Sequence, residues 1–107
     1  MKILLACNAG ASTSIVVQKM KEAAKELNED HEIEAVDIAS VRGEIGNFDV
    51  LLLGPQVAMH LKRFTEMLKG SVPVAVIKPM DYGRLRGAAI LAYAKQLVEE
   101  AKNNENN

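Results

Sequence analysis

Cysteine is scarce in this sequence and long hydrophobic runs are missing, and each shortage excludes a class of protein. One cysteine, Cys7, stands among 107 residues. A lone thiol forms no internal disulfide, and no Cys/His cluster offers tetrahedral ligands to zinc. The apolar runs are far shorter than the ~20 residues that span a bilayer, and the apolar stretch at the amino terminus is too short for a secretory signal.

An excess of charge of one sign is also missing. The chain carries 13 basic and 14 acidic side chains, a formal net charge of −1. This balance argues against a protein that coats nucleic acid or an anionic membrane. We expect a cytoplasmic protein with one domain over residues 1–102 and a polar tail, 103–107, that frays. A monomer is the default expectation, and no metal or other cofactor is expected.

Short apolar runs alternate with amphipathic stretches along the chain. Strands are predicted at residues 2–6, 32–38, 48–53 and 72–77. Helices are predicted at 13–28, from 57 to 68 with an end near Gly70, and at 84–102; a loop or short helical turn is expected at 40–47, and loops at 7–12 and 78–83.

Strands that alternate with helices indicate an α/β fold with parallel pairing. We predict a single open four-stranded parallel sheet in the order 2-1-3-4, with helices on both faces. Ligands of such sheets bind beyond the carboxyl ends of the strands, where the strand order reverses. Cys7 is expected as the first residue after strand one, and therefore in that crevice.

The segment after the first strand has the composition of an anion-binding loop. Small residues let successive N–H groups turn inward, and the start of the next helix adds its partial positive charge. The same field favours the thiolate form of Cys7. We expect Cys7 to act as a nucleophile that forms a phosphocysteine, with this phosphate-binding loop: Asn8, Ala9, Gly10, Ala11, Ser12, Thr13 and Ser14.

A different interpretation stays open for this loop, in which Cys7 is a buried filler and Ser12 caps the helix. The position at the end of a strand favours the nucleophile. A nucleotide site is not expected, because neither the Gly-Lys-Ser/Thr of a P-loop nor a G-x-G-x-x-G pattern is present.

Three motifs together resemble a known family. They are Cys-x-Ala-Gly-x-Ser-Thr-Ser at residues 7–14, LLLGPQV at 51–57 and DYG at 81–83. The chain resembles the enzyme IIB component of the bacterial phosphoenolpyruvate-dependent sugar phosphotransferase system, lactose/cellobiose (chitobiose) class. The resemblance implies that Cys7 accepts a phosphoryl group from a phosphohistidine of enzyme IIA. It also implies transfer to a sugar, of the β-linked disaccharide class, at the membrane permease enzyme IIC.

The loop is also similar to that of the low-molecular-weight tyrosine phosphatases, with the signature Cys-x5-Arg-Ser/Thr. Thr13 stands where that signature has arginine, so the guanidinium that clamps a transferring phosphoryl group is missing. A phosphatase-like or arsenate-reductase-like enzyme is therefore the alternative function. Asp81 is the candidate for a leaving-group acid, although helix capping by Asp81 is the preferred interpretation.

Other side chains near the predicted crevice have open roles. Gln56 follows strand three and either hydrogen-bonds the loop or a partner, or simply starts a helix. Tyr82 either covers the phosphate or packs in its loop. His31 is expected to be solvated, and His60 to be a surface or packing residue. An apolar docking patch around the crevice is expected from Ala11, Met59 and Met80.

Overall fold

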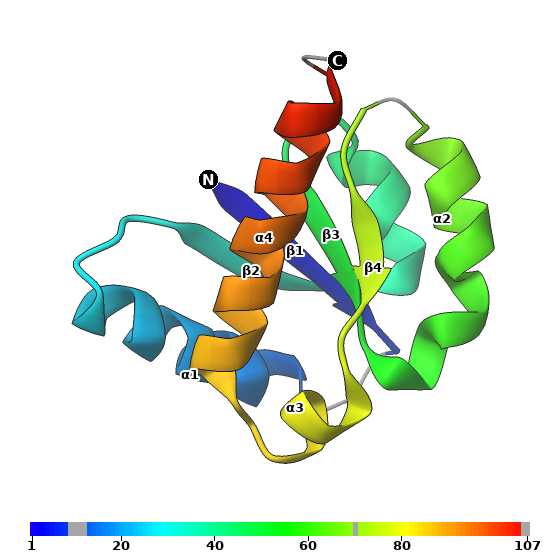
Figure 1. Ribbon diagram of the computed structural model, residues 1–107. Helices are drawn as coiled ribbons and strands as arrows, with labels where there is room; N and C mark the ends of the chain where they lie inside the picture. The colour runs from blue at the N-terminus through cyan, green and yellow to red at the C-terminus, as the bar shows by residue number, and fades with distance from the viewer. Residues whose placement is uncertain (9–12, 70, 106–107) are drawn as a thin grey trace.

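The computed structural model describes residues 1–8, 13–69 and 71–105 and contains one parallel four-stranded sheet (Figure 1). The strands are β1 (Lys2–Cys7), β2 (Glu32–Asp37), β3 (Val50–Leu53) and β4 (Val74–Val76), and their order is β2-β1-β3-β4. The predicted α/β fold and strand order are confirmed. The connecting helices are α1 (Thr13–Glu26), α2 (Leu61–Met67), α3 (Pro79–Gly83), α4 (Gly87–Glu105) and two 3-10 helices, η1 (Ile38–Glu44) and η2 (Pro55–His60).

The central strand β1 is covered on both sides, which explains its unbroken apolar sequence. Ile3 and Leu5 point to one face and pack in a cluster with α1 and α4. Leu4 and Ala6 point to the other face and pack in a cluster that includes side chains of η1, η2 and α2. Alternation along a strand explains this division, since neighbouring side chains point to opposite faces. By the same alternation, Cys7 lies on the face that α1 and α4 cover.

Helices α1 and α4 cross at close range on this face of the sheet. A Cβ atom on Gly87 would lie 2.3 Å from the carbonyl carbon of Lys19 and 2.7 Å from the backbone nitrogen of Met20. A side chain at position 87 would overlap backbone atoms of α1, so it would force the two helices to shift. This contact fixes the first residue of α4 against the middle of α1.

Three predicted boundaries are wrong. Cys7 is the last residue of β1, where it pairs in register with Asp37, rather than the first residue after the strand. Residues 78–83 are not a loop, because α3 forms from Pro79, whose fixed φ suits a first helical turn. The last helix begins at Gly87, three residues later than predicted, and continues to Glu105.

The helices of the described residues include none that is long and apolar enough to cross a membrane.

Candidate functional site

Cys7 lies at the carboxyl edge of the sheet, between β2 and the end of β3. Its exposed fraction is 2%, so the thiol is almost fully enclosed. Asp37 is its register partner on β2. That carboxylate accepts a hydrogen bond from the backbone N–H of Ala39 at 2.9 Å and so caps η1. The acidic neighbour in the sheet is therefore engaged with its own chain segment.

The residue that follows β3 makes room for the sulfur. The N–H of Gly54 donates to the carbonyl of Ala6 at 2.9 Å, which continues the β1–β3 pairing by one residue. A Cβ atom on Gly54 would lie 2.9 Å from Sγ of Cys7, a distance that real Cβ atoms do not adopt. Gly54 is thus a site residue, although the sequence predicts only that it ends a strand. The signal for its role is a glycine directly after the strand that pairs with the cysteine-bearing strand.

Gln56 contacts the thiol directly. The S–H of Cys7 donates to Oε1 of Gln56 at 3.5 Å, a long hydrogen bond even for sulfur. Pro55 and Gln56 open η2, and a turn bond from the N–H of Val57 to the carbonyl of Gly54 at 3.0 Å holds this segment in place. Gln56 thus lies at the start of a helix, one of its two expected roles, and its side chain also contacts the sulfur itself.

Thr13 and Tyr82 meet across the same edge of the sheet. Both residues are buried, at 5% exposure, and their hydroxyl oxygens are 3.3 Å apart. Thr13 is the first residue of α1, and Tyr82 lies in α3. The hydrogen bond therefore links α3 to the helix end that faces the carboxyl edge. Tyr82 is enclosed at this edge, and a role in covering the phosphate stays a prediction.

The predicted phosphate-binding loop is described only at its ends. Asn8 is exposed after β1, and Ser14 is exposed in the first turn of α1. The residues between Asn8 and Thr13 lie outside the described part of the chain; they are Ala9, Gly10, Ala11 and Ser12.

Asp81 does not cap the last helix, so that interpretation is wrong. It lies inside α3, and its Oδ1 is 3.4 Å from Nη1 of Arg86, with which it forms an ion pair. The N–H of Arg86 also donates to the carbonyl of Asp81 at 2.9 Å and helps to end α3. The carboxylate thus stabilises the connection between α3 and α4.

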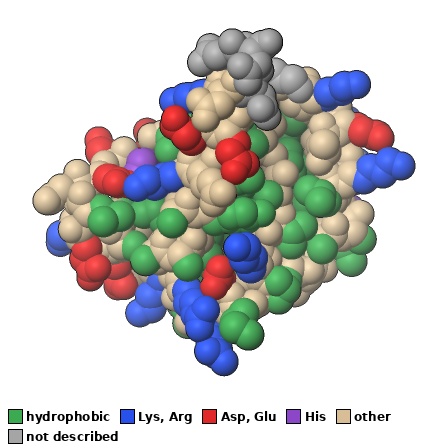
Figure 2. All heavy atoms as spheres, viewed as in Figure 1, with side chains coloured by type: hydrophobic (Ala, Val, Ile, Leu, Met, Phe, Trp, Pro, Cys, Tyr) green, Lys and Arg blue, Asp and Glu red, His purple; other side chains and the backbone are tan. Residues whose placement is uncertain are grey.

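Two methionines stand exposed on segments that follow β3 and β4. Met59 in η2 is 74% exposed, and Met80 in α3 is 59% exposed. In Figure 2, hydrophobic and basic side chains lie together at the lower edge of the view, where Figure 1 has α3. A contact site needs such side chains to form one contiguous patch, so the docking patch stays a prediction. The third expected member of the patch, Ala11, lies outside the described residues.

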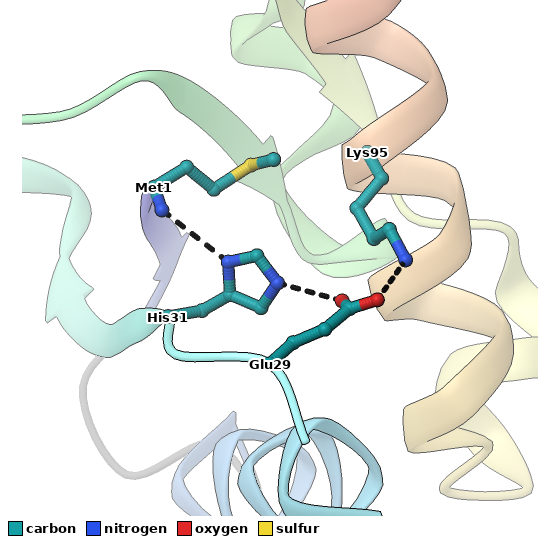
Figure 3. Close-up of polar contacts among 4 residues, drawn as sticks. All are labelled: Met1, Glu29, His31 and Lys95. Atoms are coloured by element: carbon teal, nitrogen blue, oxygen red, sulfur yellow. Dashed lines mark hydrogen bonds and ion pairs between the residues drawn. The ribbon is translucent and has the colours of Figure 1, made fainter. Parts of the chain in front are cut away.

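The two histidines lie away from this edge or beside an aromatic ring. His31 is not solvated as expected, because its side chain is only 10% exposed. Its Nε2 donates to Oε1 of Glu29 at 2.8 Å, and its Nδ1 accepts from the amino-terminal ammonium of Met1 at 3.3 Å (Figure 3). His60 packs edge-on against Phe64, with ring centroids 6.4 Å apart. Among the described residues, no group of three or more His, Cys, Asp or Glu side chains could hold a metal ion.

Comparison with protein families gives a match over nearly the whole chain. Residues 2–93 match the family described as "PTS system, Lactose/Cellobiose specific IIB subunit". The galactose-specific EIIB component of the phosphotransferase system of Lactococcus lactis subsp. cremoris (strain MG1363) is 43% identical over 102 residues, which cover 90% of this chain and 94% of that protein. The oligo-beta-mannoside-specific EIIB component of Bacillus subtilis (strain 168) is 37% identical over 98 residues, covering 91% and 95% of the two chains.

Solved structures give the same result. The solution structure of the cellobiose-specific phosphotransferase IIB component from Borrelia burgdorferi superposes with a TM-score of 0.73 at 39% identity, and the match covers 97% of this chain and 93% of that one. The lactose-specific IIB component domain from Streptococcus pneumoniae has a TM-score of 0.79 at 17% identity, with coverage of 91% and 96%, and supports the fold alone. The resemblance seen in the sequence motifs is thus confirmed.

Proposed function

The chain belongs to the lactose/cellobiose-specific IIB family of the phosphotransferase system, and we propose that it carries phosphoryl groups on Cys7 during sugar uptake. The observation that supports this assignment is the placement of the chain's one thiol. Cys7 ends the central strand of a parallel sheet at the edge where such folds bind ligands. Gly54 leaves space at its sulfur, and the amide of Gln56 contacts it.

The proposed reaction is two successive phosphoryl transfers at sulfur. The Cys7 thiolate attacks the phosphorus of a phosphohistidine on enzyme IIA; the S–P bond forms, the N–P bond breaks, and the electron pair returns to the imidazole. A sugar hydroxyl at enzyme IIC then attacks the same phosphorus; the O–P bond forms, the S–P bond breaks, the hydroxyl proton passes to solvent and the thiolate is released. The backbone of residues 8–14 is proposed to bind the phosphoryl oxygens, as the start of α1 is the partial positive end of a helix. The scheme uses no metal or nucleotide.

The residue at position 13, Thr13, favours a phosphoryl carrier over a phosphatase. The hydroxyl of Thr13 is buried against Tyr82, so no guanidinium reaches the site from this position. Without that charge, the transition state for attack by water is less stabilised. The phosphocysteine therefore hydrolyses slowly and persists until its acceptor is present. Asp81, the candidate for a leaving-group acid, pairs with Arg86 and is proposed only as a secondary participant in the transfer.

The partners in this proposal are enzyme IIA as donor and enzyme IIC as the site of the sugar acceptor. Their contact surface is proposed to include Met59 and Met80, which are exposed on η2 and α3. Methionine is a flexible apolar side chain that adapts to more than one partner. Similar proteins are named for cellobiose, galactose and oligo-beta-mannosides, and we propose a β-linked disaccharide as the sugar. The protein is proposed to act at the cytoplasmic face of the membrane, through IIC.

Phosphorus NMR tests the function directly. The protein is incubated with phosphoenolpyruvate, the general phosphotransfer proteins and IIA, and a phosphothiolate resonance is expected. It should vanish when a β-linked disaccharide and membranes that carry IIC are added. Cys7→Ser should abolish the resonance, whereas Ser71→Ala, at an exposed position away from the site, should leave it unchanged. Stoichiometric labelling of a Cys7→Ala protein would show that the phosphoryl group is carried elsewhere.

A further inference from the structure

The contact between Cys7 and Gln56 raises a question of hydrogen-bond polarity. In the structure the thiol is the donor, and Oε1 of Gln56 is the acceptor at 3.5 Å. A thiolate or a phosphothiolate has no S–H to donate, so the same oxygen would then face negative charge. The pair in its present orientation therefore suits only the neutral thiol.

Glutamine is a side chain able to meet both states, because its amide carries an acceptor oxygen and a donor NH₂ group on one plane. Rotation about the terminal torsion exchanges the two, and this torsion has a broad, roughly two-fold profile. Gln56 is exposed, whereas Cys7 is 2% exposed. The amide is thus free to turn toward a sulfur that has little access to water.

We propose that Gln56 is a donor–acceptor switch for Cys7. Its Oε1 accepts the S–H of the resting thiol, and its Nε2 donates to the sulfur once the proton has left to solvent. The ionisation part of this inference concerns the unphosphorylated protein. Its extension, that Nε2 also donates to an oxygen of the phosphoryl group received from a phosphohistidine donor, rests on the proposed function.

The surroundings of the pair support a specific role over a chance contact. A Cβ atom on Gly54 would lie 2.9 Å from Sγ and 3.0 Å from Oε1 of Gln56, so both groups share the space above one glycine. The turn bond from Val57 to Gly54 fixes the backbone on which Gln56 stands. The amide end of the side chain is therefore held at the sulfur while it keeps its freedom to rotate.

Two substitutions of similar size separate the roles of the amide. Gln56→Glu keeps the shape and the acceptor but has no donor, and its charge repels a thiolate. Gln56→Met keeps the length and removes both functions. Because position 56 is exposed, both variants are expected to fold, and thermal unfolding followed by circular dichroism checks this.

The readout is the rate of alkylation by iodoacetamide across a pH series. Cys7 is the one cysteine in the chain, so the rate reports this thiol alone. The alkylation midpoint is expected to move upward by about one pH unit in Gln56→Glu and by roughly half as much in Gln56→Met, since the first adds repulsion to the loss of a donor. A Glu variant with the wild-type profile would overturn the switch, and so would a Met variant shifted as far as the Glu variant.

A second measurement extends the test to the phosphorylated state. The rate of phosphoryl transfer from phosphorylated IIA should fall about tenfold in Gln56→Met and further in Gln56→Glu. Transfer at the wild-type rate in both variants would remove the extension to the phosphoryl group. If wild-type Cys7 is not phosphorylated at all, the proposed function fails, while the alkylation profiles still decide the ionisation switch.

Discussion

The two ends of the sheet differ in the kind of groups that form their hydrogen bonds. At the carboxyl edge the contacts of Cys7 and Thr13 are between uncharged groups: the thiol of Cys7 with the amide of Gln56, and the hydroxyl of Thr13 with that of Tyr82. At the amino edge the contacts join charged groups. There the Nζ of Lys95 donates to Glu29 at 2.7 Å, and Glu29 in turn accepts from His31, which contacts the ammonium of Met1 (Figure 3).

This difference separates a site prepared for a ligand from a cluster that is already satisfied. A phosphoryl group brings a charge of about −1.5 to −2, and the nearby carboxylates of the carboxyl edge are already engaged, Asp37 with the N–H of Ala39 and Asp81 with Arg86. The amino edge also has a cleft, lined by Met1, Lys2, Asp30, Glu32 and Asn47. Its lining mixes two cationic groups with two carboxylates, so it has no excess charge to attract an ion.

The largest expected effect at the carboxyl edge comes from a single methyl group. Gly54→Ala places a Cβ atom 2.9 Å from Sγ of Cys7, so the sulfur must shift by several tenths of an ångström or more. Misplacement on this scale is expected to lower the rate of phosphoryl transfer by about 10²-fold. Single-turnover transfer from phosphorylated IIA measures it.

Gly43→Ala is the matched control, because a Cβ atom at Gly43 would meet nothing within 4 Å. That variant should transfer at the wild-type rate. Equal rates for Gly54→Ala and wild type would show that the sulfur tolerates crowding. The carboxyl edge would then not differ from the amino edge in depending on exact spacing.

A smaller effect is expected from the hydroxyl pair at the same edge. Tyr82→Phe removes one partner of the buried bond to Thr13 and should lower the free energy of unfolding by about 1 kcal/mol. Urea denaturation measures this change. Tyr93→Phe is the control, since the ring of Tyr93 on α4 is expected to keep its contact with Lys78, 5.3 Å from the centroid.

A double-mutant cycle then tests whether the two hydroxyls act together. If they do, Thr13→Val should lower the free energy of unfolding less in the Tyr82→Phe background than in wild type, because the shared bond is already lost there. Additive losses from the two substitutions would contradict the coupling of α3 to the start of α1.

The sheet was predictable from the sequence because its strands are covered on both faces. Strands of that kind are nearly continuous apolar runs, and the run at β1 stands out without any knowledge of its neighbours. Helix α3 has no such pattern, and residues 78–83 are expected to form a loop. It is only five residues long, Pro79–Gly83, and it depends on the bond from Arg86 to Asp81 and on burial of Tyr82 rather than on a periodic pattern.

The features of the site also divide into those that the sequence predicts and those that depend on distant segments of the chain. The motif around Cys7 is contiguous in sequence and was therefore visible, whereas the space that Gly54 leaves for the sulfur depends on the pairing of β1 with β3. The burial of His31 also depends on a distant residue, because Lys95 on α4 completes its cluster through Glu29. Contacts between segments far apart in the chain have no signature in a single sequence.

The smallest expected effect is a change in stability at the amino edge, and it tests directly whether that edge acts independently of the carboxyl edge. The hydrogen bond from Lys95, followed by that from His31, holds the pKa of Glu29 below its ordinary value of 4.5. A lowered pKa means that the native state favours the carboxylate, so its stabilising effect is fully present above pH 4.5 and is lost as the pH falls through the lowered value. Glu29→Gln should therefore be slightly less stable than wild type near neutral pH, by less than Tyr82→Phe.

That difference in stability should disappear in acid. Glu29→Gln should transfer phosphoryl groups through Cys7 at the wild-type rate at every pH at which both proteins are folded. Thermal unfolding across a pH series measures the first, and the transfer assay measures the second. Glu66→Gln, an exposed carboxylate on the opposite face of the sheet, is the control for loss of a charge alone. Slower transfer in Glu29→Gln would mean that the charged edge acts on the uncharged one, because a cluster that only stabilises the fold has no route to the sulfur.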